Sequence, residues 1–198
     1  MSAARMQAAP VREVPLGAAD VNIERRADGS ILLRSPNPLA AYPAKLTERL
    51  VHWAQVAPAR TFLAQRDAGG SGWRSLSYGD AWRRVRALGQ ALLDRGLSQE
   101  RPLAILSDND IEHALLALAC MHVGIAYAPV SSAYSLVSTD HAKLKHVIGL
   151  LTPGLVYATD GARFAKAIAA AVPAGTEVLT GAEFISLEET KFGDRVDE

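Results

Sequence analysis

The five histidines of this sequence are the residues best suited to metal chemistry, but their spacing argues against a shared ion. His113 and His122 are nine residues apart in one predicted helix, which places them on opposite faces at about 100° per residue. His141 and His146 are separated by about 140° on the next predicted helix. The sequence also lacks the HExxH, CxxC and DxDxDG motifs. We therefore predict no metal site.

Motifs of nucleophilic catalysis and of nucleotide binding are also missing. No GxSxG motif occurs, so a serine nucleophile of that type is not predicted. The glycines of GGSG, residues 69–72, lie between two predicted strands and have no nearby lysine, whereas a phosphate loop opens a helix and supplies one. We interpret them as a turn. No GxGxxG follows a predicted strand, and no residue is assigned a catalytic or cofactor-binding role.

Polar residues that follow two predicted strands are the best candidates for ligand binding. They are Ser107, Asp108 and Asn109 after one strand, and Ser131, Ser132 and Tyr134 after the next. In open parallel sheets, ligands bind beyond the carboxyl ends of the strands. We therefore nominate Ser131, Ser132 and Tyr134 for a substrate cleft. A structural alternative stays open, because Asn109 would cap the following helix and the serines suit strand-to-helix turns.

The elements that would position these residues alternate between strand and helix from residue 102 onward. In chain order the segments are PLAILS, NDIEHALLALACMHVG, AYAPVS, STDHAKLKHVIGLL, LVYAT, ARFAKAIAAAV and TEVLT. Short connections between alternating elements are typical of parallel strands joined by helical crossovers. The predicted fold class is α/β, with an open, doubly wound and mostly parallel sheet.

Two predicted hairpins and two predicted helices precede this alternation. VNIERR and SILLRS flank a turn at Asp28 and Gly29, and TFLAQR and WRSLS flank the GGSG turn. A helix that Thr47 caps precedes Pro58. A second helix begins after Ser77 and ends at Gly96.

That second helix separates apolar from charged residues. Trp82, Val85, Leu88 or Gly89, and Leu92 share one face. Three arginines, Arg83, Arg84 and Arg86, are expected to form a solvated face.

Composition excludes several functional classes. The formal net charge is zero, so neither nucleic acid nor anionic lipid is an expected partner. The sequence contains no run of about twenty apolar residues, so a membrane span is not predicted. Cys120, the single cysteine, lies in an apolar run and is predicted to be a buried thiol, which fits a reducing compartment. We expect a cytoplasmic protein.

The segment order suggests three regions. Residues 1–18 are predicted to be a mobile tail, residues 19–42 a β-hairpin and linker, and residues 43–198 an α/β subdomain.

Three segments together resemble the beginning of the adenylate-forming (AMP-binding) acyl-CoA and aryl-CoA synthetases. They are WRSLSYGDAWRRVRALGQALLDRGL, RPLAILSDNDIEHALLALACMHVGIAYAPVSSAYS and LTPGLVYATD. The earlier stretch from VNIERR to TFLAQR, with SSAYSLVSTDHAKLKHVIGLLTPGLVYATDG, is most similar to feruloyl-CoA synthases. The resemblance implies the N-terminal subdomain of that ligase fold. It also implies a complete enzyme that uses ATP, magnesium and coenzyme A to convert a hydroxycinnamic acid, an aromatic carboxylic acid, into its thioester.

The motifs that carry this chemistry in the family have no counterpart here. The phosphate loop ending in Pro-Lys, the Tyr-x-Thr-Glu motif, the ribose-binding Asp and the C-terminal Lys are all absent from the 198 residues. We therefore expect an N-terminal fragment, truncated before the phosphate loop, that is inactive alone and binds no cofactor tightly. A subdomain without its neighbour exposes apolar surface, so self-association is also expected.

Three alternatives stay open at this point. The parent enzyme could be a fatty-acyl-CoA synthetase. The chain could instead be a stand-alone α/β interaction module without catalysis, or a nucleotide-binding domain of unrelated function.

Overall fold

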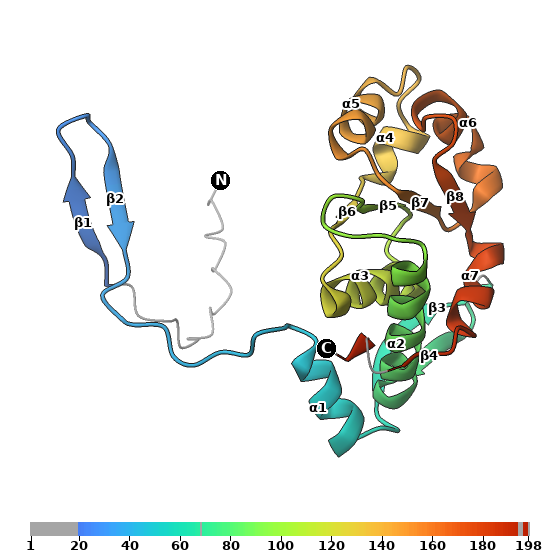
Figure 1. Cartoon of the computed structure of the whole chain (residues 1–198), viewed down its shortest axis with the longest axis horizontal. Coiled ribbons are helices and arrows are strands. Elements are labelled where there is room, and N and C mark those ends of the chain that lie inside the picture. Colours follow the sequence, from blue (N-terminus) through green and yellow to red (C-terminus); the bar gives the residue numbers. More distant parts are fainter. Residues whose placement is uncertain (1–19, 68, 194–195, 198) are drawn as a thin grey trace, which may run out of the picture. The chain divides into compact units, whose positions relative to one another are not determined.

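The structure is a computed structural model of the chain and describes residues 20–67, 69–193 and 196–197. The tail expected over residues 1–18 lies outside these residues. The chain divides after Tyr42 into two units (Figure 1).

The elements follow in chain order. The strands are β1 (Asn22–Arg25), β2 (Ile31–Arg34), β3 (Thr61–Arg66), β4 (Trp73–Ser77), β5 (Leu103–Leu106), β6 (Tyr127–Pro129), β7 (Leu155–Ala158) and β8 (Glu177–Thr180). The helices are α1 (Glu48–Val56), α2 (Tyr78–Asp94), α3 (Ile111–Val123), α4 (Ser132–Leu136), α5 (Ala142–Leu151), α6 (Gly161–Ala171) and α7 (Gly181–Glu188).

The N-terminal unit contains the antiparallel hairpin β1–β2. Gly29 has φ of +84°, a left-handed conformation that favours glycine. The Asp28 carboxylate accepts hydrogen bonds from the Ser30 N–H at 2.9 Å and from its hydroxyl at 2.7 Å. The predicted turn at Asp28 and Gly29 is confirmed.

The second unit is built on a parallel sheet with the strand order β6-β5-β7-β8. The chain runs from β5 through α3 to β6 and then returns past β5 through α4 and α5 to β7. This change of direction makes the sheet doubly wound. The predicted α/β class and parallel sheet are confirmed, whereas the strand order was not readable from the sequence.

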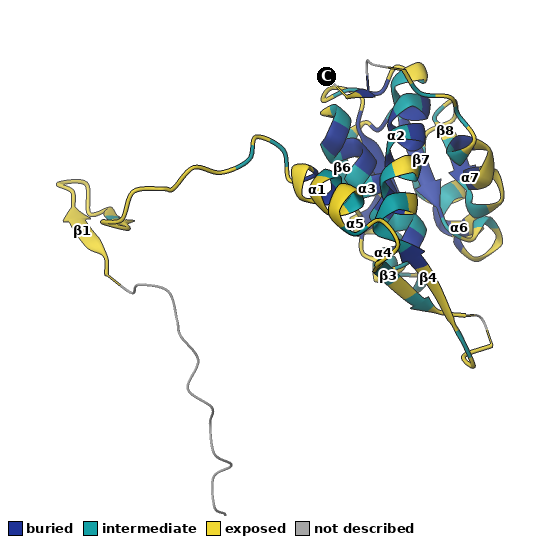
Figure 2. Cartoon of the chain, turned by 90° about the horizontal axis from the view of Figure 1, so that it is seen from below, coloured by how far each residue is buried: buried dark blue, intermediate teal, exposed yellow. Residues whose placement is uncertain are grey.

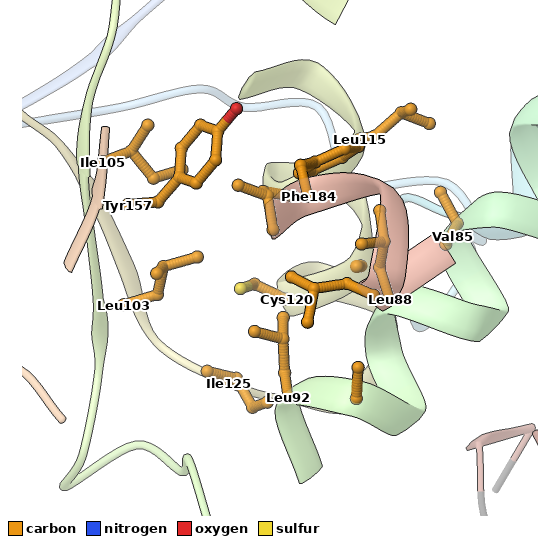
Figure 3. Packing of buried hydrophobic residues seen from close by; sticks show 14 of the residues in the cluster. Val85, Leu88, Leu92, Leu103, Ile105, Leu115, Cys120, Ile125, Tyr157 and Phe184 are labelled. Carbon is orange, nitrogen blue, oxygen red and sulfur yellow. The ribbon is translucent and has the colours of Figure 1, made fainter. Parts of the chain in front are cut away.

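Alternate residues of the strands face two separate cores. Leu103 and Ile105 of β5 belong to a core cluster with residues of α2, α3 and α7, and Figure 3 shows its side chains. Ala104 and Leu106 belong to a second cluster with residues of α5 and α6. Because side chains alternate along a strand, the sheet is covered on both faces. The two central strands, β5 and β7, are buried along their whole length, whereas the edge strands β6 and β8 are partly exposed (Figure 2).

Cys120 lies inside the first cluster, as predicted (Figure 3). Burial raises the pKa of its thiol to about 12, which leaves it protonated and unreactive at neutral pH.

The start of α2 also agrees with the sequence. The Asp80 N–H donates to Ser77 Oγ at 3.1 Å, and the Ser77 hydroxyl donates to Asp80 Oδ2 at 2.8 Å. Gly96, with φ of +68°, follows the last turn. The GGSG segment joins β3 and β4, which pair antiparallel, so it is a turn.

Several local predictions are wrong. Asp110, not Asn109, caps α3, and the Thr47 side chain makes no cap hydrogen bond to α1. Helices α4 and α7 were not predicted at all. Within the described residues, no helix combines the length and apolarity needed to cross a membrane.

Candidate functional site

A hollow of about 450 Å³ lies at the carboxyl ends of β5 and β6. Its lining residues are Ser107, Asp108, Asn109, His113, Pro129, Val130, Ser131 and Ser132. The hollow forms here because β5 and β6 are parallel neighbours that pair Ile105 with Pro129. The residues that follow the two strands therefore meet at one edge of the sheet.

Ser107 and His113 form a polar pair in the hollow. Ser107 is buried, and its Oγ lies 2.9 Å from His113 Nδ1. The same Nδ1 lies 3.2 Å from the Asp108 carbonyl oxygen. A carbonyl oxygen only accepts, so the tautomer with the proton on Nδ1 is the one that satisfies both contacts.

This tautomer decides what the pair can do chemically. A serine nucleophile needs a histidine nitrogen that accepts its proton. With the proton on Nδ1, His113 donates toward Ser107 and does not accept the serine proton. The pair can instead bind a ligand through hydrogen bonds. In the sequence, His113 was considered only as a potential metal ligand. Its position just after the turn that follows Ser107 could have indicated that the two side chains lie close together.

The acidic member of the hollow is already paired. Asp108 Oδ2 accepts from Arg163 Nη1 at 2.5 Å, and this ion pair joins the end of β5 to α6. Arg163 and then Ser132 hold the pKa of the Asp108 carboxyl below its ordinary value. Both partners are about half exposed, so the pair contributes little stability.

Asp110 rather than Asn109 organises the first turn of α3. Its Oδ1 accepts from the His113 backbone N–H at 2.7 Å, and its Oδ2 accepts from the Thr159 hydroxyl at 2.6 Å. One carboxylate thereby caps the helix and ties it to the end of β7. Asn109 is exposed and lines the hollow.

Only two of the three residues nominated for a substrate cleft line the hollow. Ser131 and Ser132 line the hollow. Tyr134 is not among its lining residues, since its ring packs against the second core cluster and lies 5.4 Å from Lys143 Nζ. The assignment of a substrate cleft to these residues stays a prediction.

A second hollow of about 450 Å³ lies beside α1, and its lining includes Lys45, Thr47, Trp82, Arg86 and His122. Thr47 Oγ1 is 3.0 Å from His122 Nδ1. This contact explains why the Thr47 hydroxyl does not cap α1. Burial lowers the pKa of His122, with Lys45 adding to the effect.

Two of the three arginines expected on a solvated face are instead paired and only partly exposed. Arg84 lies 3.2 Å from Glu188, and Arg86 pairs with Asp197. Arg83 is exposed, as expected. The prediction failed for Arg84 and Arg86 because their partners belong to α7 and to the last residues of the chain, which local periodicity does not reveal.

Among the described residues, no group of three or more His, Cys, Asp or Glu side chains lies close enough together to hold a metal ion.

Comparison with known proteins identifies one family. The sequence profile of a family described as AMP-binding enzyme matches residues 50–195. The protein "4-coumarate--CoA ligase-like 9" of Arabidopsis thaliana is 27% identical over 179 residues, which are 89% of this chain and 27% of that protein. Fumosorinone synthetase of Cordyceps fumosorosea is 24% identical over 123 residues, which are 62% of this chain and 3% of that protein. The chain thus spans about a quarter of the first relative and far less of the second.

Solved structures share the fold. A putative long-chain-fatty-acid CoA ligase from Rhodopseudomonas palustris matches with a TM-score of 0.60 and 23% identity, over 75% of this chain and 37% of that one. The NpsA N-terminal subdomain of Klebsiella oxytoca, in complex with 3-hydroxyanthranilyl-AMSN, matches with a TM-score of 0.56 and 19% identity, over 75% and 33%. At these identities the likeness concerns the fold alone.

Proposed function

The chain belongs to the AMP-binding enzyme family, and from this premise we propose that it is the N-terminal α/β subdomain of an ATP-dependent acid-thiol ligase. The observation that carries the proposal is the family match over residues 50–195, which runs from α1 past α7. In the proposed reaction a carboxylic acid and ATP form an acyl-adenylate and pyrophosphate, and coenzyme A then takes the acyl group. We place this reaction in the cytoplasm.

A hydroxycinnamic acid of the ferulic type is the substrate class we propose. Support comes from the resemblance of residues 21–66 and 131–161 to feruloyl-CoA synthases, and from a relative named as 4-coumarate–CoA ligase-like. A fatty acid is the second candidate, because one structural neighbour is titled a putative long-chain-fatty-acid CoA ligase.

The hollow at β5 and β6 does not fit the triphosphate or magnesium. Its carboxylate, Asp108, is already paired with Arg163, and no lysine is among the described residues that line it. A triphosphate site needs uncompensated positive charge, and a magnesium site needs free carboxylate oxygens. We therefore propose that these 198 residues supply scaffold, and that ATP, magnesium and coenzyme A are not held by this hollow.

A pyrophosphate-release assay tests the proposal. We would assay ferulate, coumarate, benzoate and a long-chain fatty acid with the 198-residue chain and with the product of the whole reading frame that encodes it. The expected result is release with ferulate or coumarate by the whole product, and none by the 198-residue chain. Preference for the fatty acid would overturn the aryl assignment, and release by the 198 residues alone would overturn the scaffold role.

The runner-up is an α/β interaction module without catalysis. It predicts that the whole reading-frame product contains no Gly-rich loop followed by Pro-Lys and releases no pyrophosphate with any acid of the panel. The same assay and the nucleotide sequence therefore separate the two proposals.

A further inference from the structure

Strand β2 pairs with β1 on one edge only, and its outer edge carries exposed apolar residues. Ile31 and Leu33 are 51% and 64% exposed, and Leu32 between them is partly exposed. An edge strand that is apolar on both faces is a template for pairing with another strand. We propose that β2 pairs antiparallel with β2 of a second copy of this chain, which would give a four-stranded sheet β1-β2-β2-β1.

The hydrogen-bond phase of the hairpin shows which backbone groups are free for this pairing. The Arg26 N–H donates to the Ser30 carbonyl oxygen at 2.9 Å. Hydrogen-bonded and non-hydrogen-bonded pairs alternate along an antiparallel ladder. Ser30 and Leu32 therefore bond to β1, whereas Ile31 and Leu33 direct their N–H and C=O groups outward.

This phase restricts the register between two copies, because an outward-facing residue must meet an outward-facing residue. With Leu32 on the two-fold axis, Ile31 of each copy lies opposite Leu33 of the other. The two Leu32 side chains then form a non-hydrogen-bonded pair, and Arg34 lies opposite Ser30. In this register the central pairs consist of apolar residues only, and no two like charges lie opposite each other.

The edge of β1 does not offer an equivalent surface. Its sequence, Asn22-Ile23-Glu24-Arg25, carries charge at two of four positions. If β1 of two copies paired with Glu24 on the two-fold axis, two carboxylates would lie opposite each other. With Arg25 on the axis, two guanidinium groups would do so. With Ile23 on the axis, Glu24 would lie opposite Asn22 and one apolar pair would remain. Charges of this kind protect an edge strand from pairing.

Energetics and symmetry also favour a second copy. An isolated two-stranded hairpin is only marginally stable in water, whereas a sheet of three or more strands with an apolar face can be stable by itself. The cross-strand pairs within the hairpin place Ile23 beside Leu33 and Arg25 beside Ile31, so one face is already mostly apolar. Pairing of β2 with itself is isologous and closes at the dimer, whereas pairing of β2 with β1 of another copy would continue into open fibres.

Cross-linking tests the register directly. In the proposed dimer the two Cα atoms at position 32 are about 4.5 Å apart, inside the range that a disulfide spans. We therefore expect Leu32→Cys to form a disulfide-linked dimer in oxidised glutathione about tenfold faster than Ile23→Cys, its control on β1. The native Cys120 is buried and does not compete. Equal rates for the two variants would overturn the proposed register.

A charge at the same position tests the association itself. Light scattering over a concentration series should show that the wild-type chain and the control Ile23→Lys dimerise, whereas Leu32→Lys is monomeric because two ammonium groups would face each other. Mixing Leu32→Lys with Leu32→Glu should restore a dimer, which also shows that neither variant has simply unfolded. A monomeric wild-type chain at high concentration, or dimers of Leu32→Lys, would overturn the proposal. The first of these outcomes would leave the apolar face to another partner.

Discussion

At the scale of single residues, Asp110 performs two tasks that its neighbours do not share. One carboxylate oxygen accepts from the backbone N–H of His113, and the other accepts from the Thr159 hydroxyl. Because His113 follows in the same turn, this carboxylate also sets the position from which the imidazole contacts Ser107. Asn109, one residue earlier, has the right chemistry for a cap but is exposed at the edge of the hollow.

The difference between these two neighbours is measurable. Asp110→Ala should lower the free energy of unfolding by about 1–2 kcal/mol, because it removes a helix cap and leaves the Thr159 hydroxyl without its acceptor. Asn109→Ala, the matched control, should change it by no more than about 0.5 kcal/mol. Urea unfolding followed by circular dichroism gives both values. Equal losses for the two variants would contradict the assignment of the cap.

At the scale of elements, close packing of α2 on α3 holds the first core together. Gly89 of α2 is buried, and a Cβ added there would lie 2.8 Å from Cγ1 of Val123 in α3. Only a hydrogen atom fits at this crossing. Gly149 of α5 is the opposite case, since an added Cβ would meet no atom within 4 Å.

The two helical glycines should therefore respond in opposite directions to the same substitution. Alanine is the better helix former, so Gly149→Ala should raise the free energy of unfolding by about 0.5–1 kcal/mol. Gly89→Ala should lower it by about 1–2 kcal/mol, because overpacking against Val123 outweighs the gain in helix propensity. Denaturant unfolding of both variants measures the effects. Stabilisation by Gly89→Ala would show that α2 and α3 separate more easily than the structure indicates.

At the scale of the whole molecule, the chain consists of two units that divide after Tyr42. Hydrophobic side chains of the N-terminal unit are exposed, among them Leu39 and Tyr42 at 87% and 74%. The second unit holds both core clusters. This distribution supports a domain boundary at residues 42 and 43, which we propose as the point where the chain can be cut.

A chain that begins at Pro43 should fold by itself. Its free energy of unfolding should agree with that of the full chain within about 0.5 kcal/mol, because none of the described residues 20–42 belongs to either core cluster. Thermal or urea unfolding at low concentration, where association does not contribute, provides the comparison. A large loss of stability, or aggregation of the shorter chain alone, would mean that the two units depend on each other.

The sequence by itself determined the features that depend on local pattern. Apolar alternation and periodicity predicted the parallel strands, both hairpins and most helices, and the Ser77 cap and the turn at Gly29 follow from residues close in sequence. The short helices α4 and α7 were missed because a few residues carry too weak a periodic signal. The segments that resemble AMP-binding synthetases, and their order along the chain, were also sufficient to identify the family.

Only the tertiary structure decided what depends on contacts between distant segments. Thr47 was expected at a helix cap, yet its hydroxyl lies beside His122, which is 75 residues away. The choice of Asp110 over Asn109 depends on Thr159 at the end of β7, and the pairing of Arg84 depends on Glu188 of α7. Periodicity indicates which face of a helix is apolar. It does not indicate which polar group of a neighbouring element will contact that helix. For that reason the fold was predictable from the sequence, and the polar geometry of the hollow was not.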